Sequence, residues 1–388
     1  MKKKIIILGS TGSIGTSTID IIKKNKDYFN VILLSANQNY KKLIQQAKSI
    51  NAKNVLIKDK TLFHKVKNGL KKTSTKIFTG EFPINKIINK KVDYTIAGIV
   101  GIAGLKQTLD SIQVSKAVAI ANKESIICGW DIIRKQIKKS NTKIYPLDSE
   151  HFSIMELTKN ITNEEVEEII ITASGGPFLN LPISKLKNVE PRDAIKHPNW
   201  TMGKKISVDS ANLMNKVFEV VEAFKIFNFD KSKYKIIIHP QSYVHSIIRF
   251  KNGLIKMILY NADMKIPISN ILFGKKKNIL NTDKFNEKKL NNLTFEKVNT
   301  KQFPAVKLIE KILKLGPSTP TIINAANEVL VDLFLSKKIG FLDIVKVINK
   351  IIKDKEFKKY ATNTSKSIYD IKKTDYWARL KTIAICVK

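Results

Sequence analysis

Residues 5–22 read IIILGSTGSIGTSTIDII, and this stretch decides the fold of the N-terminal part of the chain. The β-branched run at 5–8 is typical of a buried strand, and residues 16–22 can form a helix with isoleucines on one face. Gly9, Gly12 and Gly15 stand between them, where glycines let the backbone approach a pyrophosphate at the helix N-terminus. The GxxGxxG spacing therefore predicts a nucleotide site, with an ordinary tight turn as the alternative.

Short apolar runs separated by helical patterns continue this motif up to Pro146. Strands are expected at 31–35, 54–57, 95–100, 117–121 and 143–146, and helices at 41–50 and 105–112. Strands and helices that alternate in this way form a doubly wound parallel sheet, whose strands are buried on both faces. The sequence thus predicts an α/β, Rossmann-like domain over residues 1–147.

The pattern changes after residue 147, which indicates further domains. Residues 148–273 are predicted to form a second, α+β domain with a strand at 168–172, a helix over about 211–227, and a meander at 235–239, 245–250 and 254–260. Asn252 and Gly253 are expected at the hairpin turn of that meander. Residues 274–300, rich in Lys and Asn, predict an extended linker. Helical patterns at 305–315, 322–337, 342–353 and 367–382 predict a helical bundle over residues 301–388.

The composition bears on possible partners. The 388 residues carry 69 Lys and Arg against 33 Asp and Glu, a net charge of +36, which raises the question of a nucleic-acid partner. Nearly all of this charge is lysine, scattered over the chain, so we expect no specific nucleic-acid partner. Cys128 and Cys386 form no disulfide or zinc pattern, which fits a reducing cytoplasm. No apolar run approaches the ~20 residues of a membrane span, so no membrane partner is expected.

Three acidic side chains are candidates for a metal site. Asp148 and Glu150 follow a strand in PLDSEH, and two carboxylates at this spacing can bind a hard cation if a third oxygen ligand joins them. A helix cap explains the same hexapeptide equally well. Glu219 is the third acid, on a polar helix face with Asn215.

The helix that carries Glu219 also offers the donors that a phosphate needs. Ser210, Asn215 and Lys216 supply a hydroxyl, an amide and an ammonium group. The alternative is that Lys216 and Glu219 form a plain surface pair, which is the usual explanation of such spacing. The neighbouring hydroxyl and amide favour the phosphate site.

Further candidates follow the strands of the two sheets. Asn122, Lys123 and Glu124 come directly after a buried strand, where an open α/β sheet binds its ligand, and a surface ion pair is the alternative. Ser174 opens a Ser-Gly-Gly turn that is either a ligand loop or a plain one. The loop from His197 to Gly203, which includes Trp200, has the character of a lid. We interpret His151, His239 and His245 as structural, and residues 324–328 (NAANE) as packing or capping.

These segments together resemble one enzyme family. GSTGSIGTST, AIANKES, PLDSEH, ITASGGPF, HPNWTMGKKISVDSANLMNK, HPQSYVHS and NAANE resemble, in this order, the motifs of 1-deoxy-D-xylulose 5-phosphate reductoisomerases. The resemblance implies a homodimeric oxidoreductase of the non-mevalonate route to isoprenoid precursors. Such enzymes convert 1-deoxy-D-xylulose 5-phosphate to 2-C-methyl-D-erythritol 4-phosphate with NADPH and Mg²⁺, Mn²⁺ or Co²⁺, by retro-aldol and aldol isomerisation and then hydride transfer.

The resemblance also implies a role for each matching residue. The metal ligands would be Asp148, Glu150 and Glu219. The substrate would contact Lys123, Ser149, Glu150 and His197, with its phosphate on Ser174, Ser210, Asn215 and Lys216. NADPH would contact Thr11, Gly12, Ser13, Ile14, Asn37, Gln38, Asn39, Asn122, Glu124 and Gly203.

One position departs from the family pattern. Many members have Gly-Lys/Arg-Asn where this chain has Asn37-Gln38-Asn39, so the cation expected at the 2′-phosphate of NADPH is missing. This strand end therefore does not decide between NAD and NADP, although Lys41 or Lys42 could compensate. Two other functions compete with the reductoisomerase: a metal-independent Rossmann dehydrogenase whose acids merely cap helices, and a nucleic-acid-binding protein.

Overall fold

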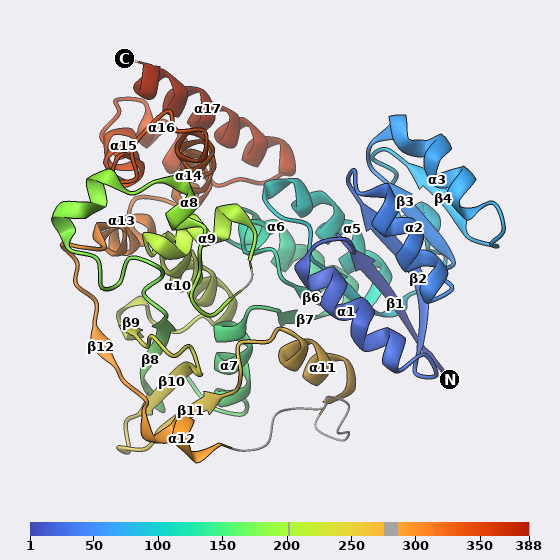
Figure 1. Cartoon of the computed structure of the whole chain (residues 1–388), viewed down its shortest axis with the longest axis horizontal. Helices are drawn as coiled ribbons and strands as arrows, with labels where there is room; N and C mark the ends of the chain where they lie inside the picture. Colours follow the sequence, from blue (N-terminus) through green and yellow to red (C-terminus); the bar gives the residue numbers. More distant parts are fainter. Residues whose placement is uncertain (201, 275–285, 388) are drawn as a thin grey trace. The chain divides into compact units, whose positions relative to one another are not determined.

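The computed structural model describes residues 1–200, 202–274 and 286–387 (Figure 1). The contacts divide them into two compact units. The first contains residues 1–125, 131–152 and 264–274, and the second contains 126–130, 153–263 without residue 201, and 286–387. The finer division at residues 147, 273 and 300 stays a prediction.

The first unit is built on a parallel sheet in the order β4-β3-β2-β1-β5-β6-β7, which confirms the Rossmann-like prediction (Figure 1). Strand β4 was not predicted from the sequence, because its residues, KIFT, are only partly buried and lack the continuous apolar run of the neighbouring strands. The strands are β1 (Lys3–Leu8), β2 (Phe29–Ala36), β3 (Asn54–Ile57), β4 (Lys76–Thr79), β5 (Val92–Ala97), β6 (Ser115–Ile120) and β7 (Lys143–Pro146).

Helices alternate with these strands, and the central strand is apolar on both faces. The last four residues of β1 have no exposed surface, as expected for a strand covered on both sides. The parallel strands end at one edge of the sheet, which is where such folds bind ligands. The helices are α1 (Ser13–Lys24), α2 (Tyr40–Ser49), α3 (Phe63–Leu70), α4 (Ile84–Ile87), α5 (Leu105–Val114) and α6 (Lys123–Ser140), and α7 (Ser149–Leu157) follows β7.

A late segment of the chain returns to the first unit. Helix α11 (Lys265–Phe273) packs on α1, and the ring of Phe273 meets Phe29 edge-on at 5.1 Å between centroids. The ammonium of Lys265 lies 3.4 Å from a carboxylate oxygen of Asp20 on α1. A ring contact with β2 and an ion pair with α1 therefore attach this segment to parts of the chain that lie more than two hundred residues earlier in the sequence.

The second unit contains a mixed sheet in the order β11-β10-β8-β9-β12. The predicted meander is wrong for one strand: β9 pairs in parallel with β8, which separates it from β10. The predicted hairpin between β10 and β11 is confirmed, with Gly253 at a φ of +86°. The strands are β8 (Val166–Ala173), β9 (Tyr234–Ile238), β10 (Val244–Phe250), β11 (Ile255–Leu259) and β12 (Glu296–Lys297).

The helix expected over about 211–227 is confirmed as α10 (Met214–Phe227), and a further helix that was not predicted, α9 (Lys204–Ala211), precedes it. Leu213 separates them in the left-handed region, with a φ of +62°, and the side chain of Asn212 accepts a hydrogen bond from the backbone N–H of Met214. Ser210 therefore lies in the last turn of α9, ahead of the break. Leucine carries no sequence signal for such a break, because it rarely adopts a positive φ.

Helices dominate the end of the chain, as predicted (Figure 1). They are α13 (Leu308–Lys314), α14 (Thr319–Leu335), α15 (Asp343–Ile352), α16 (Phe357–Ala361) and α17 (Ile368–Val387). The predicted linker lies partly outside the described residues, and its described part contains α12 (Glu287–Asn291) and β12. Among the described helices, none is long and apolar enough to span a bilayer.

Candidate active site

The glycine-rich turn joins β1 to α1. A side chain at Gly15 would bring its Cβ to 2.4 Å from the Gly9 carbonyl oxygen, and Gly9 itself has a φ of +70°. Gly12 is the N-cap of α1, where no side chain caps the helix and no acid stands in the first turn. The N-terminus of α1 is thus open to an anion beside Thr11, Ser13 and Ile14.

The end of β2 carries the residues expected near the adenosine ribose. Asn37, Gln38 and Asn39 are exposed, and the side chain of Asn39 caps α2 through the backbone N–H of Lys42. The amide nitrogen of Gln38 lies 3.4 Å from a carboxylate oxygen of Asp59, which follows β3. Sequence reasoning missed this acid because it considered only the end of β2, although the neighbouring parallel strand ends at the same edge.

The ends of β6 and β7 bring Lys123 and Asp148 together. Asn122 caps α6 by accepting the backbone N–H of Ser125, and its amide donates to the carbonyl of Gly101 at 2.8 Å. The ammonium of Lys123 lies 3.2 Å from a carboxylate oxygen of Asp148. Burial opposes ionisation of Asp148, but the nearby Lys123 and His151 outweigh it and hold its pKa well below the usual value. Asp148 is therefore an ionised carboxylate at neutral pH.

Glu150 and His151 also lie close to the Asp148 carboxylate. The backbone N–H of Glu150 donates to Asp148 at 3.2 Å, and the hydroxyl of Ser149 donates to the carboxylate of Glu150. The Nδ1 atom of His151, whose side chain is fully buried, lies 3.3 Å from Asp148. Glu124 is also buried, in the first turn of α6. Sequence reasoning did not assign His151 to this cluster.

In the second unit, the turn after β8 and the predicted lid share a hydrogen bond. The Nε2 atom of His197 lies 2.9 Å from the hydroxyl oxygen of Ser174. The Nδ1 atom of His197 accepts the backbone N–H groups of Asn199 and Trp200, so Nε2 carries the proton and donates to Ser174. Burial and the positive charge of Lys216 lower the pKa of His197 to about 4. The imidazole is consequently neutral at physiological pH.

Helix α10 carries a buried ion pair. The ammonium of Lys216 lies 2.7 Å from a carboxylate oxygen of Glu219, whose other oxygen accepts from the amide of Asn215. Lys216 and Glu219 are 7% and 1% exposed, so the surface pair considered from the sequence is excluded. A buried pair of this kind costs free energy through desolvation and is therefore poorly explained by stability alone.

Helix α9 lies between the predicted lid and helix α10 in the sequence. Gly203, the N-cap of α9, is exposed and belongs to the second unit. Ser210 is buried near the other end of the helix, and its carbonyl oxygen would be only 2.8 Å from a Cβ placed on Gly176. The Ser-Gly-Gly turn and the end of α9 therefore pack so closely that only a glycine fits at position 176.

Three family models describe most of the chain. Residues 5–129 match the 1-deoxy-D-xylulose 5-phosphate reductoisomerase model, and residues 144–227 and 259–381 match two C-terminal domain models of that enzyme. A reductoisomerase from Pelagibacter ubique is 45% identical over 387 residues, which cover 99% of this chain and 100% of the relative. One from Wolbachia pipientis wMel is 44% identical, over 97% of this chain and 96% of the relative.

The chain belongs to the 1-deoxy-D-xylulose 5-phosphate reductoisomerase family. The expected enzyme class, an oxidoreductase, is thereby confirmed. The Zymomonas mobilis reductoisomerase, solved in complex with NADPH, superimposes with a TM-score of 0.91 at 37% identity, covering 100% of this chain and 99% of that one. A reductoisomerase in complex with NADPH, fosmidomycin and magnesium superimposes with a TM-score of 0.93 at 29% identity, covering 99% and 98%.

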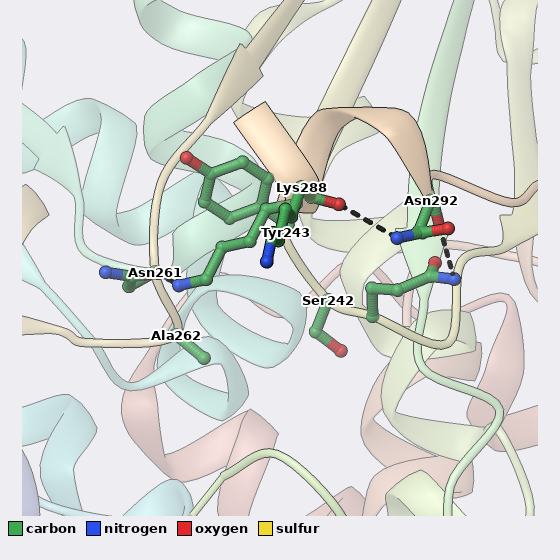
Figure 2. Close-up of a pocket in the computed structure, with 8 residues that line it drawn as sticks. Ser242, Tyr243, Asn261, Ala262, Lys288 and Asn292 are labelled. Atoms are coloured by element: carbon green, nitrogen blue, oxygen red, sulfur yellow. Dashed lines mark hydrogen bonds between the residues drawn. The ribbon is translucent and has the colours of Figure 1, made fainter. Parts of the chain in front are cut away.

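A separate hollow of about 350 Å³ lies in the second unit of the chain (Figure 2). None of the predicted site residues lines it, but one lining residue, Ser242, accepts a hydrogen bond from Asn199 in the predicted lid. The amide of Asn199 donates to the carbonyl of Pro240 at 2.6 Å and to the hydroxyl of Ser242 at 2.9 Å. The hollow is lined by Gln241, Ser242, Tyr243, Asn261, Ala262, Lys288, Lys289 and Asn292.

Proposed function

We propose that this chain converts 1-deoxy-D-xylulose 5-phosphate to 2-C-methyl-D-erythritol 4-phosphate with NADPH and a divalent metal ion. Its family membership supports this reaction, and so do the NADPH and magnesium complexes of its relatives. The observation that carries most weight is the buried ion pair of Lys216 and Glu219 on α10, together with the amide of Asn215 that bonds Glu219, because these side chains offer phosphate donors and a metal-type ligand on one helix. A simple dehydrogenase needs neither.

Asp148, Glu150 and Glu219 fit a divalent cation. Each of them offers a carboxylate, and carboxylate oxygens are the ligands that Mg²⁺ and Mn²⁺ prefer. The low pKa of Asp148 supplies a ligand that is already ionised. A cation bound by these residues supplies Lewis-acid polarisation of the substrate carbonyl.

The substrate phosphate would bind to Ser174, Ser210, Asn215 and Lys216. A phosphate accepts hydrogen bonds from hydroxyl, amide and ammonium donors, and Lys216 adds a charge in a buried setting where it is weakly screened. Binding energy at the phosphate orients carbon atoms that are remote from it, which lowers the barrier of the chemical step. Lys123 and Ser149 would contact the sugar hydroxyl groups.

NADPH fits the open N-terminus of α1. The backbone N–H groups near Thr11, Gly12, Ser13 and Ile14 suit a pyrophosphate, and the cofactor supplies the hydride for the reduction step. Asn37, Gln38 and Asn39 would meet the adenosine ribose. The family resemblance implies that Asn122, Glu124 and Gly203 would contact the remainder of the cofactor.

The loop from His197 to Gly203 would cover the substrate. A neutral His197 can donate a hydrogen bond from Nε2 to a sugar hydroxyl oxygen without adding a charge beside Lys216. The anchoring of Asn199 on Pro240 and Ser242 provides a position in which the loop is held. A covered site protects the reactive aldehyde intermediate from water.

Consumption of NADPH by the purified chain tests the activity. We expect oxidation of NADPH that requires both 1-deoxy-D-xylulose 5-phosphate and Mg²⁺ or Mn²⁺, with 2-C-methyl-D-erythritol 4-phosphate as the product by mass spectrometry. Turnover that persists in a chelating buffer would support the metal-independent dehydrogenase instead.

We also propose that the chain forms a homodimer. Among the described residues, strand β11 lies at the edge of its sheet, and Leu254, Ile255 and Met257 in and before it are exposed, so this edge offers both backbone groups for pairing and apolar side chains. Light scattering should give twice the mass of the chain. Replacement Ile255→Glu should shift that mass toward the monomer.

We place the enzyme in the cytoplasm and in the synthesis of isoprenoid precursors. Neither Cys128 nor Cys386 is in a disulfide, which fits a reducing compartment. Fractionation of the source cells, with activity measured in each fraction, tests the location, and activity in the membrane or exported fraction would refute it.

A further inference from the structure

A hydrogen bond joins the C-terminal helices to the helix that carries Ser210. The amide of Asn327 on α14 donates to a carboxylate oxygen of Asp209 on α9 at 2.7 Å. The other carboxylate oxygen of Asp209 lies 3.0 Å from the ammonium of Lys205. Asp209 is 2% exposed and Asn327 has no exposed surface, so the contact is inside the protein.

This contact buries a carboxylate and an amide, and their desolvation costs free energy that an apolar contact between the two helices would not. Ala325, Ala326 and Ala211 are buried on the same two helices, and small side chains already allow a close approach. An apolar pair in place of Asp209 and Asn327 would avoid burying a carboxylate and an amide. A directional hydrogen bond, unlike apolar packing, fixes the rotation of one helix against the other.

The rotation of α9 matters because Ser210 is the next residue after Asp209. The end of α9 is already in close contact with the Ser-Gly-Gly turn at Gly176. Beyond the break at Leu213 the chain enters α10, which carries Lys216. A small rotation of α9 would therefore displace the Ser210 hydroxyl from the donors on the neighbouring segments. It would leave the acidic side chains proposed for the metal site unchanged.

We propose that the hydrogen bond between Asn327 and Asp209 is a positioning contact, through which the C-terminal helices hold Ser210 in register with the other phosphate donors. This inference rests on the proposed phosphate site. Asp209 and Asn327 are positioning residues, because both act on the substrate through α9. The NAANE motif thus takes part in phosphate binding at a distance, beyond the packing or capping role expected from the sequence.

The first test compares two buried asparagines of α14. Asn327→Ala should raise the KM for 1-deoxy-D-xylulose 5-phosphate about tenfold, the effect of losing one hydrogen bond to a charged group, and leave the KM for NADPH unchanged. Asn324→Ala is the matched control, because Asn324 is equally buried and bonds Glu328 on its own helix. If the two variants raise the substrate KM equally, the effect is loss of packing and the proposal is wrong.

A binding measurement separates positioning from general damage. Inorganic phosphate should raise the melting temperature of the wild-type chain and of Asn324→Ala, without metal or NADPH, and should raise that of Asn327→Ala clearly less. With 1-deoxy-D-xylulose, which lacks the phosphate, the wild type and Asn327→Ala should react at the same rate. A rate deficit that persists with this substrate would overturn the proposal.

Three further variants make the outcome decisive. Asp209→Ala and the double variant Asp209→Ala/Asn327→Ala should have the same substrate KM, because the second substitution removes a bond that is already lost, whereas additive effects would refute the coupling. Ser210→Ala distinguishes this inference from the proposed function. If Ser210→Ala leaves the KM unchanged, the phosphate site itself is wrong; if it raises the KM and Asn327→Ala does not, only the positioning contact is wrong.

Discussion

Acid should destabilise the second unit through His197. The imidazole accepts two backbone N–H groups at Nδ1 and faces the charge of Lys216, so the folded chain resists adding a proton there. Its pKa is lowered from 6.5 to about 4 in the folded state, whereas the unfolded chain binds a proton below 6.5. The contribution of the neutral imidazole is therefore complete above pH 6.5 and is lost progressively as the pH falls toward 4.

The size of this effect follows from the two pKa values. At pH 5 the linkage relation gives about 2 kcal/mol of lost stability, and the half-buried position of His197 reduces this to about 1 kcal/mol. His197→Asn offers an amide oxygen that can accept the same backbone N–H groups but does not titrate. The variant should therefore lose less stability than the wild type between pH 7.5 and pH 5.

Urea unfolding of both proteins at the two pH values measures this difference. His239 also has a lowered pKa, but it is present in both proteins and cancels in the comparison. The expected result is a difference of about 1 kcal/mol between the two pH-induced losses. Equal losses would mean that His197 is as easily protonated in the folded chain as in the unfolded one, and the reasoning from its hydrogen bonds would fail.

Three other changes have clear expected outcomes. Glu219→Gln should lower turnover at least about a hundredfold, because a ligand is lost while the side chain keeps its shape, and circular dichroism should show a folded protein; unchanged turnover would remove Glu219 from the metal site. Gln38→Arg should raise the kcat/KM ratio of NADPH to NADH about tenfold, since a guanidinium binds the 2′-phosphate, and an unchanged ratio would show that this phosphate is read elsewhere. Gly176→Ala should cost about 2 kcal/mol more than Gly253→Ala in thermal unfolding. Both glycines have a positive φ, but only Gly176 has a backbone atom within 3 Å of the added carbon, so similar losses would argue against the close contact with α9.

The parallel sheet could be predicted because its strands are continuous apolar runs. The order of strands in the second sheet could not, because alternating side chains indicate a strand but not its partner, and β9 pairs with β8 from far along the chain. The break at Leu213 was missed for a different reason. Its cause is a backbone conformation that leucine rarely adopts, and the neighbouring Asn212 is the only residue whose side chain hints at a turn.

Prediction of the site was limited in the same way. Lys123, Asp148 and Glu150 follow strands that end at a shared edge, so their proximity could be inferred from topology. Other contacts of the site join segments that are far apart in the sequence. The contact of Gln38 with Asp59 and that of Asp209 with Asn327 therefore have no signature in the local sequence.

The return of α11 to the first unit has a consequence for synthesis on the ribosome. The seven-stranded sheet emerges first and can form early, since chains fold from the N-terminus as they are made. The rings of Tyr28 and Phe29 nevertheless lack their neighbour until Phe273 has been translated. During that interval the nascent first unit leaves exposed the ring of Phe29, which is buried in the complete chain.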